Sequence, residues 1–205
     1  MKNVLAAALI ATAFAAAASA ETRSVGAFNA VDARGRFRVE IVAGANRAVE
    51  IDGPDAQRIA ARVNGDELVL SPVDRNWFGS EPEIHAVVRV TAPALASVQA
   101  SRGADVEVRD LRSDQFNADA SMGGVLRLAG GCGRLDAAAS MGGEIDAGAF
   151  ACTHVHAAAS MGGTLRVTAR QAVEASASMG GVIAVSGAPA QRESHSSMGG
   201  EVSFD

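Results

Sequence analysis

The sequence has few of the aromatic and basic side chains on which many binding sites depend. Its 205 residues include no tyrosine and one tryptophan, and Lys2 is the only lysine. The other cations are arginines scattered among acidic residues, without a basic stripe of the kind that follows nucleic-acid phosphates. With a formal net charge of -5, the chain is not expected to bind nucleic acid.

Long apolar runs are missing beyond the N-terminus. Residues 1–20 carry one positive charge, Lys2, followed by an apolar, alanine-rich stretch that ends in Ala18-Ser19-Ala20. This pattern predicts a secretory signal peptide that is cleaved after Ala20 and is too short to span a membrane. No later apolar run approaches the roughly 18 residues that a membrane helix needs. We therefore expect an exported protein, periplasmic or extracellular, without a transmembrane segment after cleavage.

One short motif, Ser-Met-Gly-Gly, is abundant. It occurs at residues 121–124, 140–143, 160–163, 178–181 and 197–200, so that successive copies are 19, 20, 18 and 19 residues apart. A nearly fixed period of this length is typical of a repeat architecture in which each copy belongs to one structural unit.

Around each motif, apolar and polar residues alternate. In the first unit one parity holds Phe116, Ala118, Ala120, Met122, Gly124, Leu126 and Leu128. Because successive strand residues point to opposite faces, this set is predicted to lie inside, methionine included. Five such units bury their apolar faces continuously only when they are stacked coil on coil. The sequence thus predicts an all-β fold, a right-handed parallel β-helix with about 19 residues per coil.

The N-terminal half follows the same alternation less regularly. Residues 21–98 are expected to form irregular strands, and residues 99–205 the regular coils. A short helix is predicted over 55–63, where Ile59, Ala60 and Val63 recur at helical spacing. Whether 21–98 form a separate lobe is left open at this level.

Several segments resemble, in order, one known family. They are Gly26-Ala27-Phe28, residues 37–41, 49–53, 65–70 and 90–95. Together with the small-residue turns downstream, they are similar to the head GIN domain family of auto-transporter adhesins, over a domain spanning 21–205. The resemblance implies a β-helical domain at the cell envelope with a role in adhesion, and it implies no enzyme activity.

The methionines fall in one column, one per coil. They are Met122, Met141, Met161, Met179 and Met198. Their parity predicts that they fill an interior corner beside glycine, where a flexible side chain packs well. A ladder of thioethers that binds soft copper(I) is the alternative. We expect packing, and hence no cofactor and no metal site.

A second column, four residues before each serine, is polar and outward. It holds Asn117, Asp136, His156, Glu174 and Glu193. An imidazole between two carboxylates, with Asp136 and Glu174 flanking His156, could bind zinc. Solvated complementary charges explain the same row and are an ordinary device on sheet surfaces. We predict the charge row, and metal binding by these three residues stays open.

Two cysteines, Cys132 and Cys152, lie 20 residues apart in the sequence. One coil of separation brings their backbones to about 5 Å, inside the window for a disulfide. Because export leads to an oxidising compartment, we predict that the two cysteines are bridged.

Catalytic motifs are missing. The sequence has no nucleophile elbow, metalloprotease helix or dinucleotide fingerprint. Many polysaccharide lyases and hydrolases are β-helices, so the outward Asp105, Asp119 and Asp136 are candidate carboxylates for a carbohydrate-active enzyme. Because aromatic platforms for sugar rings are scarce, we expect instead no catalytic residue and a module that presents a flat face to a cell-surface glycan or envelope protein.

The C-terminal coil is only partly built, since the sequence ends at Asp205 shortly after the last motif. An incomplete end exposes unpaired strand edges. We expect these edges to be covered by N-terminal residues or by a second copy, which would make a homo-oligomer.

Overall fold

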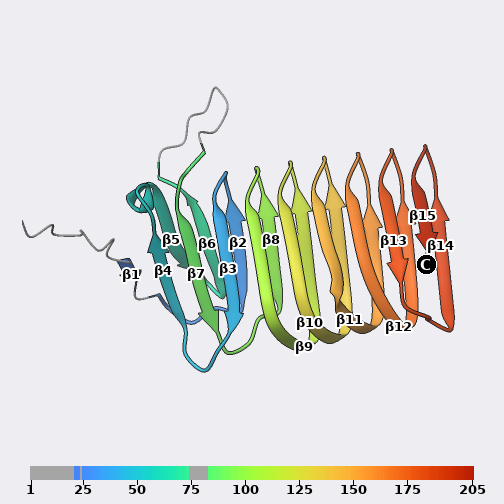
Figure 1. The fold of residues 1–205 in the computed structure, drawn as a ribbon, viewed down its shortest axis with the longest axis horizontal. Helices are drawn as coiled ribbons and strands as arrows, with labels where there is room; N and C mark the ends of the chain where they lie inside the picture. Colours follow the sequence, from blue (N-terminus) through green and yellow to red (C-terminus); the bar gives the residue numbers. More distant parts are fainter. Residues whose placement is uncertain (1–20, 24, 74–82) are drawn as a thin grey trace, which may run out of the picture.

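The computed structural model describes residues 21–23, 25–73 and 83–205. The predicted signal peptide, its cleavage site after Ala20 and Trp77 lie outside this part of the chain. The described strands form one 15-stranded sheet that winds into an elongated, flattened stack (Figure 1). In the part of the chain that is described, no helix is long and apolar enough to cross a membrane.

The regular coils form the C-terminal part of the stack. Their strands are β9 (Asp105–Ser121), β10 (Val125–Ser140), β11 (Glu144–Ala159), β12 (Thr164–Ala177), β13 (Val182–Ser186), β14 (Gln191–Ser196) and β15 (Glu201–Phe204). All pair in parallel. One row joins Asp105, Val125, Glu144, Thr164, Val182 and Glu201, so a coil takes 18 to 20 residues. The predicted parallel β-helix is therefore confirmed.

The core lies between the two flat faces of the stack. One inward column holds Ala118, Ala137, Ala157 and Ala175, and a facing one holds Leu126, Ile145, Leu165 and Ile183, all at most 2% exposed. Each buried leucine or isoleucine stabilises the fold by about 1.5–3 kcal/mol. The rings of Phe116 and Phe150 meet edge to face, with centroids 5.6 Å apart. Alternation of side chains along each strand thus places the apolar set inside, as predicted.

The N-terminal strands continue this stack. They are β1 (Glu21–Arg23), β2 (Ala30–Arg34), β3 (Arg38–Ala43), β4 (Ala48–Asp52), β5 (Ile59–Asn64), β6 (Glu67–Pro72), β7 (Val87–Ala92) and β8 (Ser97–Ser101). β2 and β3 form a coil whose parallel neighbours are β6 and β7 on one side and β8 and β9 on the other. β1, β4 and β5 add antiparallel pairs. The N-terminal strands therefore share one sheet and one hydrophobic core with the coils.

The helix predicted over 55–63 is wrong. The structure has one 3-10 turn, Ala56–Arg58, followed by β5. β5 and β6 form a hairpin whose two-residue turn starts at Gly65, with φ of 62°. Ile59 is fully buried, and Ala61 and Val63 pack partly against the core. Apolar residues at this spacing are thus compatible with a strand as well as with a helix. The strand forms here because β6, its partner in the hairpin, supplies its backbone hydrogen bonds.

Each Ser-Met-Gly-Gly motif forms a tight turn at the narrow edge of the stack. Gly124 N donates to Ser121 O over 2.9 Å, and the four other copies repeat this bond. Methionine has φ of 47–49° and the following glycine 73–76°. Two left-handed central residues closed by this bond define a type I′ turn.

The predicted interior position of the methionines is wrong. Four of them are 47–49% exposed, and Met198 is 79% exposed. Strand parity predicts side-chain direction only for extended backbone, whereas the turn lifts methionine and the first glycine out of the pleat. The second glycine does point inward, and at Gly124 an added Cβ would lie 2.3 Å from Ala100 O. Only glycine fits there.

The two ends of the stack are far apart (Figure 1). β1 lies at one end, and β14 and β15 lie at the other. Every residue of β14 is exposed. The described N-terminal residues therefore do not cover the last coil, which corrects that expectation. Cover by a second copy stays a prediction.

Candidate functional site

The wide edge of the stack, opposite the turns, is uneven. In β9 the inward residue Ala118 comes ten positions after the inward Val108, whereas in β12 Ala175 comes eight after Val167. The extra residues cause slips of register between neighbouring bends, and Asp110 adopts a left-handed φ of 57° next to one of them. Variation in coil length is thus absorbed at this edge.

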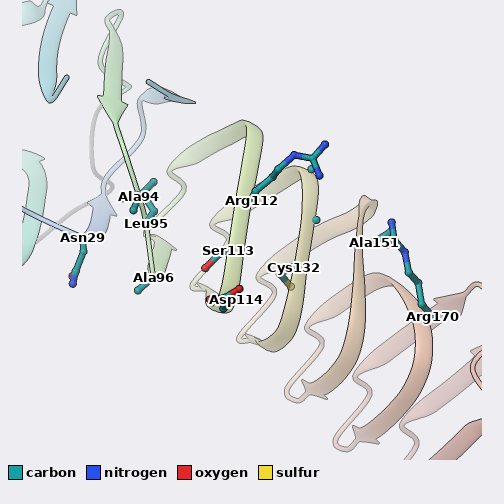
Figure 2. A pocket seen from close by; sticks show the side chains of 12 residues that line it. Asn29, Ala94, Leu95, Ala96, Arg112, Ser113, Asp114, Cys132, Ala151 and Arg170 are labelled. Atoms are coloured by element: carbon teal, nitrogen blue, oxygen red, sulfur yellow. The ribbon is translucent and has the colours of Figure 1, made fainter. Parts of the chain in front are cut away.

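A hollow of about 770 Å³ lies along the uneven edge (Figure 2). Its lining comes from the segments before β2 and β8 and from the bends of β9 to β12: Asn29, Ala94, Leu95, Ala96, Arg112, Ser113, Asp114, Gly130, Gly131, Cys132, Ala151 and Arg170. The hollow therefore crosses successive coils, with Arg112 and Arg170 contributed by strands three coils apart.

Glycine keeps the middle of the hollow free of side chains. Gly130 has φ of 136°, and an added Cβ would lie 2.0 Å from Leu111 O. At Gly131 a Cβ would lie 2.9 Å from Ala151 O. These close backbone approaches require glycine, and they leave main-chain groups near the surface of the hollow.

A disulfide ties two of the bends that line the hollow. Cys132 and Cys152 are bonded, their Cα atoms are 4.5 Å apart, and they pair in register between β10 and β11. The bridge predicted from the sequence is therefore present. It fixes the bend of β10, which carries both glycines of the hollow, to its neighbour.

The two arginines of the hollow, Arg112 and Arg170, differ in their ion pairing from the arginines on the flat face of the stack. Arg127 pairs with Asp105, and Arg166 Nη1 lies 3.3 Å from Glu144 Oε1. Arg112 and Arg170 are exposed, and neither has an ion pair within the described ranges 25–73 and 83–205. Figure 2 shows them on either side of Cys132. The hollow thus offers two guanidinium groups to an anionic ligand.

The outward column that could bind zinc is confirmed as a row. Asn117, Asp136, His156, Glu174 and Glu193 pair in register. His156 Nδ1 lies 3.3 Å from Glu174 Oε2, and Arg134 Nε lies 3.7 Å from Asp136 Oδ2. Among the described residues, no three His, Cys, Asp or Glu side chains are grouped to hold a metal ion. The one close contact between members of this row is His156 with Glu174, and metal binding by Asp136, His156 and Glu174 stays open.

Of the three candidate catalytic carboxylates, Asp119 and Asp136 lie on one face of neighbouring strands, at the roughly 7–8 Å typical of diagonal neighbours, and Asp105 lies on the other face. Asp105 precedes the bend of β9 and pairs with Arg127, whereas Asp119 follows the bend and lies on the opposite face. Burial raises the pKa of Asp119 above its ordinary value. Asp136 is two positions out of register with Asp119 on the next strand. Arg112 and Arg170 are not among the residues predicted from the sequence, where the changing repeat spacing and the pair Gly130-Gly131 were the available signals.

One family of known proteins matches most of the chain. The family model described as "Putative auto-transporter adhesin, head GIN domain" matches residues 27–189. The chain belongs to this family. No curated protein matches it.

Solved structures share the fold of this head GIN domain. A "putative adhesin" of Bacteroides fragilis is similar with a TM-score of 0.71 and 18% identity, over 93% of this chain and 97% of that one. A "putative adhesin" of Parabacteroides distasonis gives 0.64 and 13%, over 91% and 96%. A "putative lipid binding protein" of the same species gives 0.55 and 13%, over 93% and 98%. At these identities the likeness is one of fold.

Proposed function

We propose that this protein is an exported, non-enzymatic adhesion module that binds an acidic glycan of the cell surface in the hollow at its wide edge. Membership of the adhesin family supports the general role. The observation that carries the ligand class is the pair Arg112 and Arg170, exposed at a glycine-floored hollow and unpaired within the described residues. Guanidinium groups bind carboxylates and sulfates through two parallel hydrogen bonds.

The spacing of the two arginines favours an extended ligand. Neighbouring strands lie about 4.8 Å apart, so the three steps from β9 to β12 separate the two backbones by about 14 Å. A single small anion contacts both only if the two side chains extend toward each other, whereas a chain of acidic sugars presents carboxylates repeatedly. Ser113, Asp114 and Asn29 add polar groups for sugar hydroxyls. Charge and hydrogen bonds thus take the place of aromatic stacking.

Calorimetric titration with polygalacturonate, and with neutral dextran as control, tests this proposal. We expect salt-sensitive binding of the acidic polymer only. The double variant Arg112→Gln/Arg170→Gln should lose it. The matched variant Arg127→Gln/Arg166→Gln removes the same charge from the flat face and should retain it.

Four outcomes would contradict the proposal. Equal binding by both double variants would place the ligand elsewhere. Binding of neutral dextran would show that the charge of the ligand does not determine binding. Release of shortened or unsaturated sugars during incubation would support the alternative, a carbohydrate-active enzyme. Binding of an envelope protein but no acidic polysaccharide would replace the glycan as the ligand.

Export is part of the same proposal. Expressed with its first twenty residues in a bacterial host, the protein should be recovered outside the cytoplasm with Glu21 as its N-terminus, because cleavage is expected after Ala20. Intact mass and N-terminal sequencing measure this directly. Retention of Met1 on the exported protein would contradict it.

A further inference from the structure

The narrow edge of the stack carries all the methionines of the described chain. Met122, Met141, Met161, Met179 and Met198 occupy the same position of five successive turns. Each side chain is about half exposed or more. Methionine is a hydrophobic residue that interiors accommodate readily, so an exposed column of it calls for a reason.

The turns hold these thioethers in register. Gly142 N donates to Met161 O, and Gly162 N donates to Met179 O, each over 3.2 Å. The second, third and fourth turns are therefore bonded directly to one another, at the spacing of about 4.8 Å that neighbouring strands adopt. Three rotatable bonds let each side chain move its sulfur. Sulfurs from adjacent turns can thus converge on one point between them.

The turn itself does not favour methionine. Both central positions of a type I′ turn are left-handed, which suits Asn, Asp and Gly and costs a residue with a larger side chain. Arg102, with φ of 56°, occupies the equivalent position one coil earlier, so the fold accepts other residues there. Local conformation therefore gives no reason for five methionines.

Apolar character does not explain the choice either. The buried hydrophobic residues of the described chain are Ala, Val, Leu, Ile, Phe and Cys, and methionine is not among them. An edge that needed only apolar character could use the same residue types as the core. The property that distinguishes methionine from leucine is its sulfur, a soft, uncharged ligand atom. In the turn, each methionine is flanked only by serine and glycine, with no carboxylate beside it.

We propose that the methionine ladder binds a soft monovalent cation, copper(I), through thioethers of neighbouring turns. Thioether ligands select copper(I) over the hard divalent cations that prefer oxygen. The net charge of -5 favours approach of any cation. This site lies on the edge opposite the hollow, so it is independent of the proposed glycan binding.

Silver(I) is the probe for the first experiment. It is as soft as copper(I) and needs no reductant, so the Cys132–Cys152 disulfide stays intact and contributes no thiolate. The full chain, labelled with carbon-13 at the methionine methyl groups, is titrated with silver nitrate in chloride-free buffer. We expect the methyl resonances of the ladder to shift together and calorimetry to show saturable binding. Anaerobic titration with copper(I) against a chromophoric chelator then measures affinity for the proposed ion.

Two variants separate sulfur chemistry from apolar contact. Met141→Leu/Met161→Leu/Met179→Leu keeps the apolar edge and should lose silver(I) binding. Arg102→Met adds a sixth thioether at an equivalent turn and should bind more tightly than the parent. Circular dichroism should show that both variants keep the β-sheet signal.

Any of three results would overturn the proposal. Methyl resonances that do not move at saturating silver(I) would show that the ladder is no ligand. Undiminished silver(I) binding by the triple leucine variant, with its fold intact, would assign the ion to another site. An apolar probe that binds parent and leucine variant alike, without silver(I) binding, would identify the edge as a hydrophobic contact surface instead.

Discussion

Asp119 is the outward carboxyl whose surroundings oppose its charge most clearly. Its side chain is partly exposed, and its partial burial raises its pKa, so the folded protein keeps this proton to a higher pH than the unfolded chain does. Between the unfolded and folded pKa values of Asp119, the free energy of unfolding falls as pH rises. Above both values, the full loss of stability caused by the charged carboxylate is present.

Replacing Asp119 by the neutral isostere should therefore stabilise the protein at neutral pH. Asp119→Asn is expected to raise Tm at pH 7 and to leave it unchanged well below the ordinary carboxyl range, where Asp119 is protonated in both states. Thermal unfolding followed by circular dichroism at both pH values measures this. A gain of equal size at both would mean that charge is not the cause.

The paired glycines of each turn offer a second comparison between single residues. Gly143→Ala places a Cβ 2.3 Å from Ala120 O inside the stack, and should cost about 1–3 kcal/mol of unfolding free energy through overpacking. Gly142→Ala meets nothing within 4 Å, although its φ of 73° disfavours a side chain, at a cost of about 1 kcal/mol. Urea unfolding of the two variants should rank them in that order, and the reverse order would contradict the packing described here.

At the scale of one element, each narrow turn is closed by a hydrogen bond but has methionine at a left-handed position that this residue type does not favour. Met161→Asn supplies the residue type that a type I′ turn prefers. We expect it to raise the free energy of unfolding by about 1 kcal/mol, the usual cost of a left-handed conformation. Loss of stability would show that the Met161 side chain makes contacts that matter more than the backbone.

The bridge between β10 and β11 acts on the bend that carries the hollow. Cys132→Ala/Cys152→Ala should lower the free energy of unfolding by about 3 kcal/mol, the loop-entropy value for closing a loop of this length. It should also weaken binding in the hollow, because Gly130 and Gly131 lose their tie to the next coil. Intact mass must first rise by two hydrogens on reduction of the parent, and a fall in stability without that shift would need another cause.

For the whole molecule, each coil contacts chiefly the coils beside it, so stability is nearly a sum along the stack. Among the described strands, β14 pairs with β12 alone and is wholly exposed, whereas β9 to β11 have neighbours on both sides. Hydrogen exchange measured by mass spectrometry should show the fastest amide exchange in residues 191–205 and the slowest in β9 to β11. Uniform protection would indicate that the last coil is covered, as in a homo-oligomer.

The sequence predicted the stack well because its parity holds across the turns. A type I′ turn removes two residues from the pleat, an even number, so the alternation resumes in phase and Ala120, Gly124 and Leu126 all point inward. Met122, one of the two residues removed, is where the same counting fails. Parity describes extended backbone, and it carries no information about residues at the tip of a turn.

The hollow could not be predicted in this way. Its position depends on how bends of unequal length lie against one another, which alternation along one strand does not encode. Gly130 and the shift in spacing between motifs were visible in the sequence, but their effect arises only when the bend of β10 is set beside Leu111 of β9. Arg112 and Arg170 are far apart in sequence and become neighbours of one site only through the stack.

The division of labour between the two edges also makes the protein a scaffold. Register is fixed at the narrow edge by identical hydrogen-bonded turns, so the wide edge can gain or lose residues without shifting the strands, as the coils of 18 to 20 residues already do. Foreign peptides grafted into successive bends would be displayed in a line, one per coil, at the spacing of a β-sheet.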